Sequence, residues 1–104
     1  MNKNLAKAVK IIVEKADPEK IILFGSRARG ANGKDSDYDI CVIKSRIRNK
    51  RRLARKLYQD LYGVGIPIDL IVETPSGFKE NGKNPFLVQS DITKDGKVLF
   101  ERSI

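Results

Sequence analysis

Histidine is absent from this sequence of 104 residues, and cysteine occurs once, at Cys41. A single cysteine cannot form a disulfide within the chain. Without histidine the chain has neither the ligands of a Cys/His zinc cluster nor the base of a Ser-His or Cys-His catalytic pair. Any chemistry therefore depends on carboxylates, lysines, arginines or hydroxyls. Cys41 lies in an apolar run, where a free cysteine is typical core material.

Long apolar runs are also missing. No stretch approaches the roughly 20 apolar residues that a membrane-spanning helix needs, and the first residues lack the apolar stretch and cleavage site of a signal peptide. We therefore expect a cytoplasmic protein with no membrane association. An apolar fraction of 40% and a charged fraction of 33% suit a globular chain. Residues 1–104 suffice for one hydrophobic core, so we expect a single domain.

Negative charge is in short supply, because the formal net charge is +8. This balance predicts attraction to nucleotides, nucleic acids or acidic proteins without telling them apart. Much of the excess lies in the segment 44–56, at Lys44, Arg46, Arg48, Lys50, Arg51, Arg52, Arg55 and Lys56. Cations near the start of a helix are electrostatically disfavoured, which favours an external anion; a solvated basic face is the alternative.

The pattern of apolar residues predicts alternating helices and strands. We expect helices over 5–16, 26–29 and from residue 49 to Gly63 and Gly65, and strands over 20–24, 38–43 and 66–72. We expect a loop over 30–34, a polar segment over 76–84, the start of a short helix over 85–88 and an edge strand over 97–101. This order is typical of an α/β fold, with a small mixed sheet and helices packed against it.

A turn motif, Gly25-Ser26, lies between the first predicted strand and the short helix. Glycine lets the backbone approach a ligand closely, and the first turn of a helix presents free N–H groups. This combination suits a phosphate group. The alternative is that Gly25 only turns the chain and Ser26 caps the helix.

Two carboxylates, Asp37 and Asp39, lie at the start of the strand predicted over 38–43. Side chains alternate along a strand, so both leave one face while Tyr38 points to the other. Like charges so placed repel each other unless solvent or a cation intervenes. Mg²⁺, which prefers oxygen ligands, is the natural bridge, and Mn²⁺ shares this preference. Acidic residues also begin strands without any metal, which leaves a structural alternative open.

A third carboxylate, Asp69, interrupts the apolar strand predicted over 66–72. Burying a carboxylate without a partner is costly, and exposure near a strand end is the alternative. If this strand pairs with the one that carries Asp37 and Asp39, the three carboxylates come together. Three carboxylates beside a phosphate-binding turn are what two-metal phosphoryl transfer requires.

The combined spacing resembles a known signature. Gly25-Ser26, ten intervening residues and Asp37-Tyr38-Asp39 are similar to the motif of the minimal nucleotidyltransferases, a branch of the polymerase β superfamily. Residues 24–30, 36–39 and 94–101 match that family as well, so the resemblance covers nearly the whole chain. It implies the polymerase β type of nucleotidyltransferase fold.

The resemblance also implies roles for individual residues. By position, Asp37, Asp39 and Asp69 would be catalytic and bind two Mg²⁺ ions, and Gly25-Ser26 would hold the nucleotide phosphates. Arginines at positions 27 and 29 flank the same turn.

Arg27 and Arg29 are candidate nucleotide-binding residues, because guanidinium groups there would neutralise charge on the transferred phosphoryl group. Exposed or acid-paired arginines are the alternative for each.

The function expected from the resemblance is transfer of a nucleoside monophosphate, AMP from ATP or another NTP, to an acceptor hydroxyl. Minimal nucleotidyltransferases of this kind are similar to antitoxins whose partners are helical HEPN toxins, and some modify a tyrosine of the toxin. Because 104 residues leave no second lobe for an acceptor, we expect a hetero-oligomer in which the partner completes the site.

Three other hypotheses stay open. The chain could be an antitoxin that blocks its partner by contact alone, although the intact motif argues against this. It could be a small nucleic-acid-binding module that uses residues 44–56, which the charge supports but the few aromatic residues do not. It could nucleotidylate a small molecule, as the aminoglycoside enzymes do, but those proteins normally carry a further domain.

Overall fold

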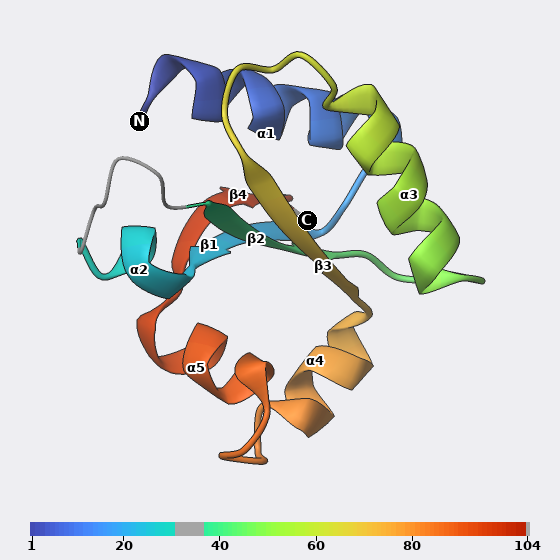
Figure 1. Ribbon diagram of the computed structural model, residues 1–104. Helices are drawn as coiled ribbons and strands as arrows, with labels where there is room; N and C mark the ends of the chain where they lie inside the picture. Colours follow the sequence, from blue (N-terminus) through green and yellow to red (C-terminus); the bar gives the residue numbers. More distant parts are fainter. Residues whose placement is uncertain (31–36, 104) are drawn as a thin grey trace.

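The computed structural model describes residues 1–30 and 37–103, which form a four-stranded sheet between two layers of helices (Figure 1). In chain order the elements are α1 (Lys3–Ala16), β1 (Lys20–Phe24), α2 (Gly25–Ala28), β2 (Tyr38–Ile43), α3 (Lys50–Asp60), β3 (Ile68–Glu73), α4 (Pro75–Asn81), α5 (Val88–Asp95) and β4 (Lys97–Glu101). The predicted α/β class is confirmed.

The sheet is mixed, with the strand order β3-β2-β1-β4. Strand β1 is antiparallel to both β2 and β4, whereas β2 and β3 are parallel and α3 makes the crossover between them. The C-terminal end of β1 therefore lies next to the N-terminal ends of β2 and β3. Strand β4 is the edge strand that the sequence predicts over 97–101.

Helices α1 and α3 cover one face of the sheet (Figure 1). The apolar stripe of α1 is buried there, as its periodicity predicts, together with Leu57 of α3 and Leu61 just after it. Asn2 caps α1 by accepting hydrogen bonds from the first-turn amides, and the Asn49 side chain caps α3 by accepting from the Arg52 amide. These caps fix where the two helices start.

Helices α4 and α5 cover the opposite face, where Phe78 and Ile92 pack on apolar side chains of β1 and β2. Both central strands are thus covered on two sides, which explains why their sequences are almost continuously apolar. Cys41 is fully buried in this layer, and burial together with the charge of Glu73 raises the pKa of its thiol to about 12. The prediction that Cys41 is core material is confirmed.

Helix α4 is the main departure from the sequence prediction, which leaves residues 76–84 as a polar segment. The helix starts because Pro75 occupies its first turn and the Thr74 hydroxyl accepts a hydrogen bond from the Gly77 amide at 3.1 Å. The predicted strand over 66–72 begins two residues later, after Pro67, and the helix expected from residue 85 begins at Val88. Most of the loop predicted over 30–34 lies outside the described residues.

Across residues 1–30 and 37–103, no helix is both long and apolar enough to span a membrane. The predicted end of α3 near the glycines is confirmed, because the helix stops at Asp60 and Gly63 and Gly65 both adopt positive φ.

Candidate active site

The candidate site lies where β1 ends and β2 and β3 begin. In the antiparallel ladder Phe24 is paired with Asp39, and in the parallel ladder Asp39 is paired with Asp69. Asp39 therefore lies directly beside Asp69 on one side and Phe24 on the other, and Gly25 follows Phe24 in the chain. The sequence prediction that strand pairing brings carboxylates together is confirmed for this pair.

Gly25 is packed tightly against the Asp39 carboxylate. A Cβ atom on Gly25 would lie 2.2 Å from Asp39 Oδ2, so the carboxylate would have to shift, and the backbone of Gly25 has φ +74°. Both features favour glycine. The glycine thus allows the backbone turn after β1 to lie close to the Asp39 carboxylate.

The ionisation of Asp39 is unfavourable in this setting. Partial burial, then the negative charges of Asp69 and Asp37, raise the pKa of Asp39 above its ordinary value, and the nearby cation of Arg29 only partly opposes them. The three aspartates are thus close enough to repel one another. A site of this kind gains stability from a bound cation.

Asp69 is exposed at the second position of β3, so of the two alternatives for this carboxylate, burial in the strand and exposure near a strand end, the structure has the second. Its place in the register is what brings it to the site. The Tyr58 hydroxyl of α3 donates a hydrogen bond to Asp69 Oδ1 at 3.2 Å and accepts one from the Leu70 amide at 2.7 Å. Sequence reasoning treats Tyr58 as part of an apolar stripe and misses this role.

Asp37 is exposed and immediately precedes β2. Within residues 1–30 and 37–103, no three acidic or cysteine side chains converge into a ready-made metal cage. The donor chemistry nevertheless fits Mg²⁺ or Mn²⁺, because neighbouring carboxylates supply only oxygen ligands, and burial together with the charges of Asp69 and Asp37 raises the pKa of Asp39. Metal binding by all three aspartates stays a prediction.

Helix α2 opens directly on Gly25, and its N-cap residue is Phe24, which provides no side-chain hydrogen bond. Ser26 is inside the helix and partly buried, so it does not act as the cap. Its role in holding a phosphate stays a prediction.

The two arginines beside the turn differ. Arg27 lies over the ring of Tyr38, with its guanidinium carbon 3.8 Å from the ring centroid, an arrangement that stabilises a cation. Arg29 is exposed, and its charge acts on Asp39. The charge of Arg29 lowers the pKa of Asp39, against the effects of burial and of the two aspartates.

The basic segment 44–56 continues into α3. Lys50 forms an ion pair with Glu73 at 2.5 Å, whereas Arg51 and Arg55 line an open hollow of about 780 Å³ together with Tyr58 and Tyr62. A second hollow, of about 530 Å³, adjoins it on the basic segment. Tyr62 is 93% exposed. Tyr58 belongs both to this hollow and to the site, because its hydroxyl donates a hydrogen bond to Asp69.

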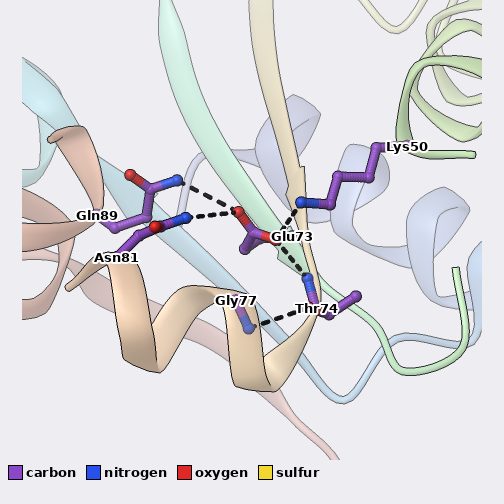
Figure 2. Close-up of polar contacts among 6 residues, drawn as sticks. All are labelled: Lys50, Glu73, Thr74, Gly77, Asn81 and Gln89. Carbon is purple, nitrogen blue, oxygen red and sulfur yellow. Dashed lines mark hydrogen bonds and ion pairs between the residues drawn. The ribbon is translucent and has the colours of Figure 1, made fainter.

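The far end of the β2–β3 pair holds another acidic residue, Glu73, which is only 4% exposed (Figure 2). Oε1 accepts from the Thr74 amide at 3.0 Å and pairs with Lys50, while the amide groups of Asn81 and Gln89 lie 3.5 and 3.4 Å from Oε2.

Although burial acts to raise the pKa of Glu73, these hydrogen bonds and the Lys50 charge lower it overall. Sequence reasoning gives Glu73 no role. The sequence feature that could have indicated a role for Glu73 is its position as the one acidic residue at the end of an apolar run.

Comparison with known proteins places this geometry in context. Residues 6–104 match the family model described as polymerase beta, nucleotidyltransferase. No curated protein matches.

Among solved structures, a Sulfolobus solfataricus protein assigned as a nucleotidyltransferase is similar, with TM-score 0.67 and 22% identity over 96% of this chain and 79% of that one. A toxin–antitoxin complex with AMP-PNP has TM-score 0.60 and 21% identity over 98% and 76%. A mutant of the toxin–antitoxin MntA–HpeT has TM-score 0.61 and 21% identity over 99% and 75%. At these identities the likeness shows a shared fold.

Proposed function

Because this chain belongs to the polymerase β nucleotidyltransferase family, we propose that it transfers a nucleoside monophosphate, AMP from ATP, to a hydroxyl group of a partner protein. The observation that carries the proposal is the pairing of Asp39 with Asp69 beside the Gly25 turn. Carboxylates in this position, next to backbone that approaches them closely, suit the binding of a nucleoside triphosphate.

In the proposed reaction the acceptor oxygen attacks the α-phosphorus of ATP. The bond from that phosphorus to the bridging oxygen breaks, pyrophosphate leaves with its electron pair, and the hydroxyl proton is released. Gly25 and Ser26 would hold the phosphates, and Arg29, with Arg27, would offset the negative charge of the transferred group.

Asp37, Asp39 and Asp69 would hold two divalent ions, Mg²⁺ in the first place. When bound, such ions activate the acceptor oxygen and stabilise the leaving pyrophosphate. The raised pKa of Asp39 supports this assignment, since after burial its causes are the charges of Asp69 and Asp37, and a cation would offset these.

The partner we propose is a toxin protein of the HEPN type, so that the chain acts as an antitoxin in a cytoplasmic hetero-oligomer. Two of the similar structures are toxin–antitoxin complexes, one of them with AMP-PNP. The HEPN class comes from the resemblance of the sequence to minimal nucleotidyltransferases.

Transfer is tested with ATP labelled at the α-phosphate. The chain is incubated with Mg²⁺, with and without the protein encoded beside it, and the products are separated under denaturing conditions. We expect covalent label on the partner that depends on Mg²⁺. Absence of label on any protein would refute catalysis.

A non-catalytic antitoxin is separated from an enzyme by Asp39→Asn. This variant keeps the surface shape, so a contact inhibitor would still neutralise the toxin in co-expression. We expect the variant to bind the partner but to transfer no label and give no protection.

A second candidate function is binding of single-stranded nucleic acid along α3. The observation that favours it is the hollow where Arg51 and Arg55 lie beside Tyr58 and Tyr62, because arginine and exposed aromatic rings together bind phosphates and stack on bases.

The test is binding of a labelled oligonucleotide at several salt concentrations by the double variant Arg51→Gln/Arg55→Gln. A control, Lys94→Gln/Lys97→Gln, removes the same charge from exposed positions elsewhere. Loss of affinity in the first double variant alone supports the surface, and equal small losses in both refute it.

A further inference from the structure

The hydroxyl of Tyr58 connects helix α3 to the strand that carries Asp69. Its oxygen lies 2.7 Å from the Leu70 amide nitrogen and 3.2 Å from Asp69 Oδ1. The contact joins residues eleven and twelve positions apart, so it exists only because α3 packs along β3.

The direction of the two hydrogen bonds follows from the groups present. A backbone amide can only donate, so the Tyr58 oxygen accepts from Leu70. The hydroxyl has one proton, and with Leu70 as a donor this proton points to Asp69. An ionised carboxylate can only accept hydrogen bonds, which agrees with a proton donated by Tyr58. The amide of the edge strand thus fixes the hydroxyl, and the hydroxyl fixes one oxygen of Asp69.

The ring that carries this hydroxyl is firmly placed. Leu57 precedes Tyr58 in α3 and is fully buried, and Leu61 follows in the core. Tyr58 itself is 42% exposed, so water reaches part of the side chain, while the helix that carries it is held by the buried leucines. The phenol therefore links helix α3 by a hydrogen bond to Asp69, an exposed carboxylate on the edge strand β3.

We propose that Tyr58 is a positioning residue that holds the Asp69 carboxylate in one orientation for binding a divalent cation. The inference rests on the proposed function, because it needs Asp69 to be a metal ligand. The hydroxyl occupies one lone pair of Oδ1 and leaves Oδ2 and the other lone pairs for a cation. A ligand held in place beforehand loses less freedom on binding, which is why groups that hydrogen-bond to metal-ligating carboxylates raise metal affinity.

A purely structural role for Tyr58 makes a different prediction. The ring also covers the edge of β3 and satisfies the Leu70 amide, so its hydroxyl could serve only the stability of the strand. In that case removal of the hydroxyl would alter the unfolding transition but leave metal affinity unchanged.

The experiment compares Tyr58→Phe with Tyr62→Phe, a matched control four residues further along, beyond the end of α3, where the tyrosine is 93% exposed. Mn²⁺ is titrated into each full-length protein in the presence of a non-hydrolysable ATP analogue, and free Mn²⁺ is followed by electron paramagnetic resonance. We expect Mn²⁺ affinity to fall by about 10- to 100-fold in Tyr58→Phe and to stay at the wild-type value in Tyr62→Phe.

A second pair of variants shows whether Tyr58 acts through Asp69. In an Asp69→Asn background, adding Tyr58→Phe should cause no further loss of Mn²⁺ affinity, because the group being positioned is already lost. The amide of Leu70 faces the sheet edge, where water can replace the hydroxyl, so the Tyr58→Phe protein is expected to fold; circular dichroism checks this.

Wild-type affinity in Tyr58→Phe would overturn the inference while leaving the proposed function intact. Equal losses from Tyr58→Phe in both backgrounds would also overturn it. If the wild-type protein itself binds no Mn²⁺ with the nucleotide present, the metal site and the role of Tyr58 are both wrong.

Discussion

The two ends of the β2–β3 strand pair both carry carboxylates, but in opposite electrostatic settings. At the start, Asp39 lies beside Asp69, and the charges of Asp69 and Asp37, after partial burial, raise the pKa of Asp39. At the end, Glu73 is surrounded by Lys50, a backbone amide and two side-chain amides (Figure 2), and its pKa is lowered. The carboxylates at the start of the pair repel one another, whereas the charge of Glu73 at the end is balanced by a cation and hydrogen-bond donors.

The difference shows which carboxylate serves the fold. Glu73 joins the start of α3 to α4 and α5 through Lys50, Asn81 and Gln89, so it connects both helical layers at one point. Asp69 accepts one hydrogen bond, from Tyr58, and the negative charges of Asp69 and Asp37 oppose the ionisation of Asp39. Perturbed carboxylates cluster at functional sites, which is why we propose the chemistry at this end of the strand pair.

Glycines mark both ends of the pair. A Cβ on Gly25 would lie 2.2 Å from an Asp39 oxygen, and one on Gly77 would lie 2.5 Å from a Glu73 oxygen. Each carboxylate thus has backbone packed closely against it. At Glu73 this contact belongs to a network of hydrogen bonds and an ion pair, whereas at Asp39 it lies beside two further carboxylates.

The largest expected effect is from Asp39→Asn. Removing one negative charge should lower nucleotide transfer at least about 100-fold, as loss of a main electrostatic group does in other active sites. Stability should be unchanged or rise by about 0.2–1 kcal/mol, because repulsion from Asp69 and Asp37 is relieved. Single-turnover transfer and urea unfolding measure the two quantities, and a clear loss of stability would contradict the comparison.

Lys50→Met should act in the opposite way. It leaves the buried Glu73 carboxylate without its cation, which we expect to cost about 2–3 kcal/mol of unfolding free energy, at the low end for a buried pair because the Lys50 side chain is 51% exposed. Lys56→Met, on the same helix and exposed, is the control and should cost little. Equal urea midpoints for the two variants would show that Glu73 does not need Lys50.

Gly25→Ala should cost about 1–3 kcal/mol, because alanine is strained at φ +74° and its Cβ clashes with Asp39. Part of this cost should disappear in an Asp39→Ala background, where the clashing carboxylate is gone. Urea unfolding of the four proteins gives the coupling free energy. Strict additivity would mean that the turn and the carboxylate are independent.

The smallest expected effect is a pH dependence. The pKa of Glu73 is lower in the folded protein than in the unfolded chain, so its ionised form stabilises the fold above the unfolded value of about 4.3. This contribution is lost as the pH falls through the lower folded pKa. The stability gap between wild type and Glu73→Gln should therefore be constant above about pH 5 and shrink in more acidic solution. A gap that persists undiminished to pH 3 would contradict this.

Much of the site could be predicted because its signals are local. The bounds of β1 and β2 follow from continuous apolar runs, and the alternation of side chains is enough to place Asp39 on the same face as Asp69 once the strands pair. The signature spacing then indicates the family. These features depend on neighbours in sequence and on one strand pairing.

Other features depend on tertiary contacts that no local pattern contains. Glu73 meets Lys50, Asn81 and Gln89 from three different helices, and Tyr58 meets Asp69 only through the packing of α3 on β3. The exposure of Asp69 reflects its place on an edge strand, which the sequence does not reveal. Helix α4 is different, because its Thr74-Pro75 start was a readable signal.

The central claim is that the aspartates at the start of the strand pair bind a divalent cation and Glu73 at its end does not. The most direct test is the shift in unfolding midpoint caused by Mn²⁺ with a non-hydrolysable ATP analogue, measured for wild type, Asp39→Asn and Glu73→Gln. We predict that wild type and Glu73→Gln are stabilised equally and that Asp39→Asn is not. An equal shift in all three proteins would contradict the claim.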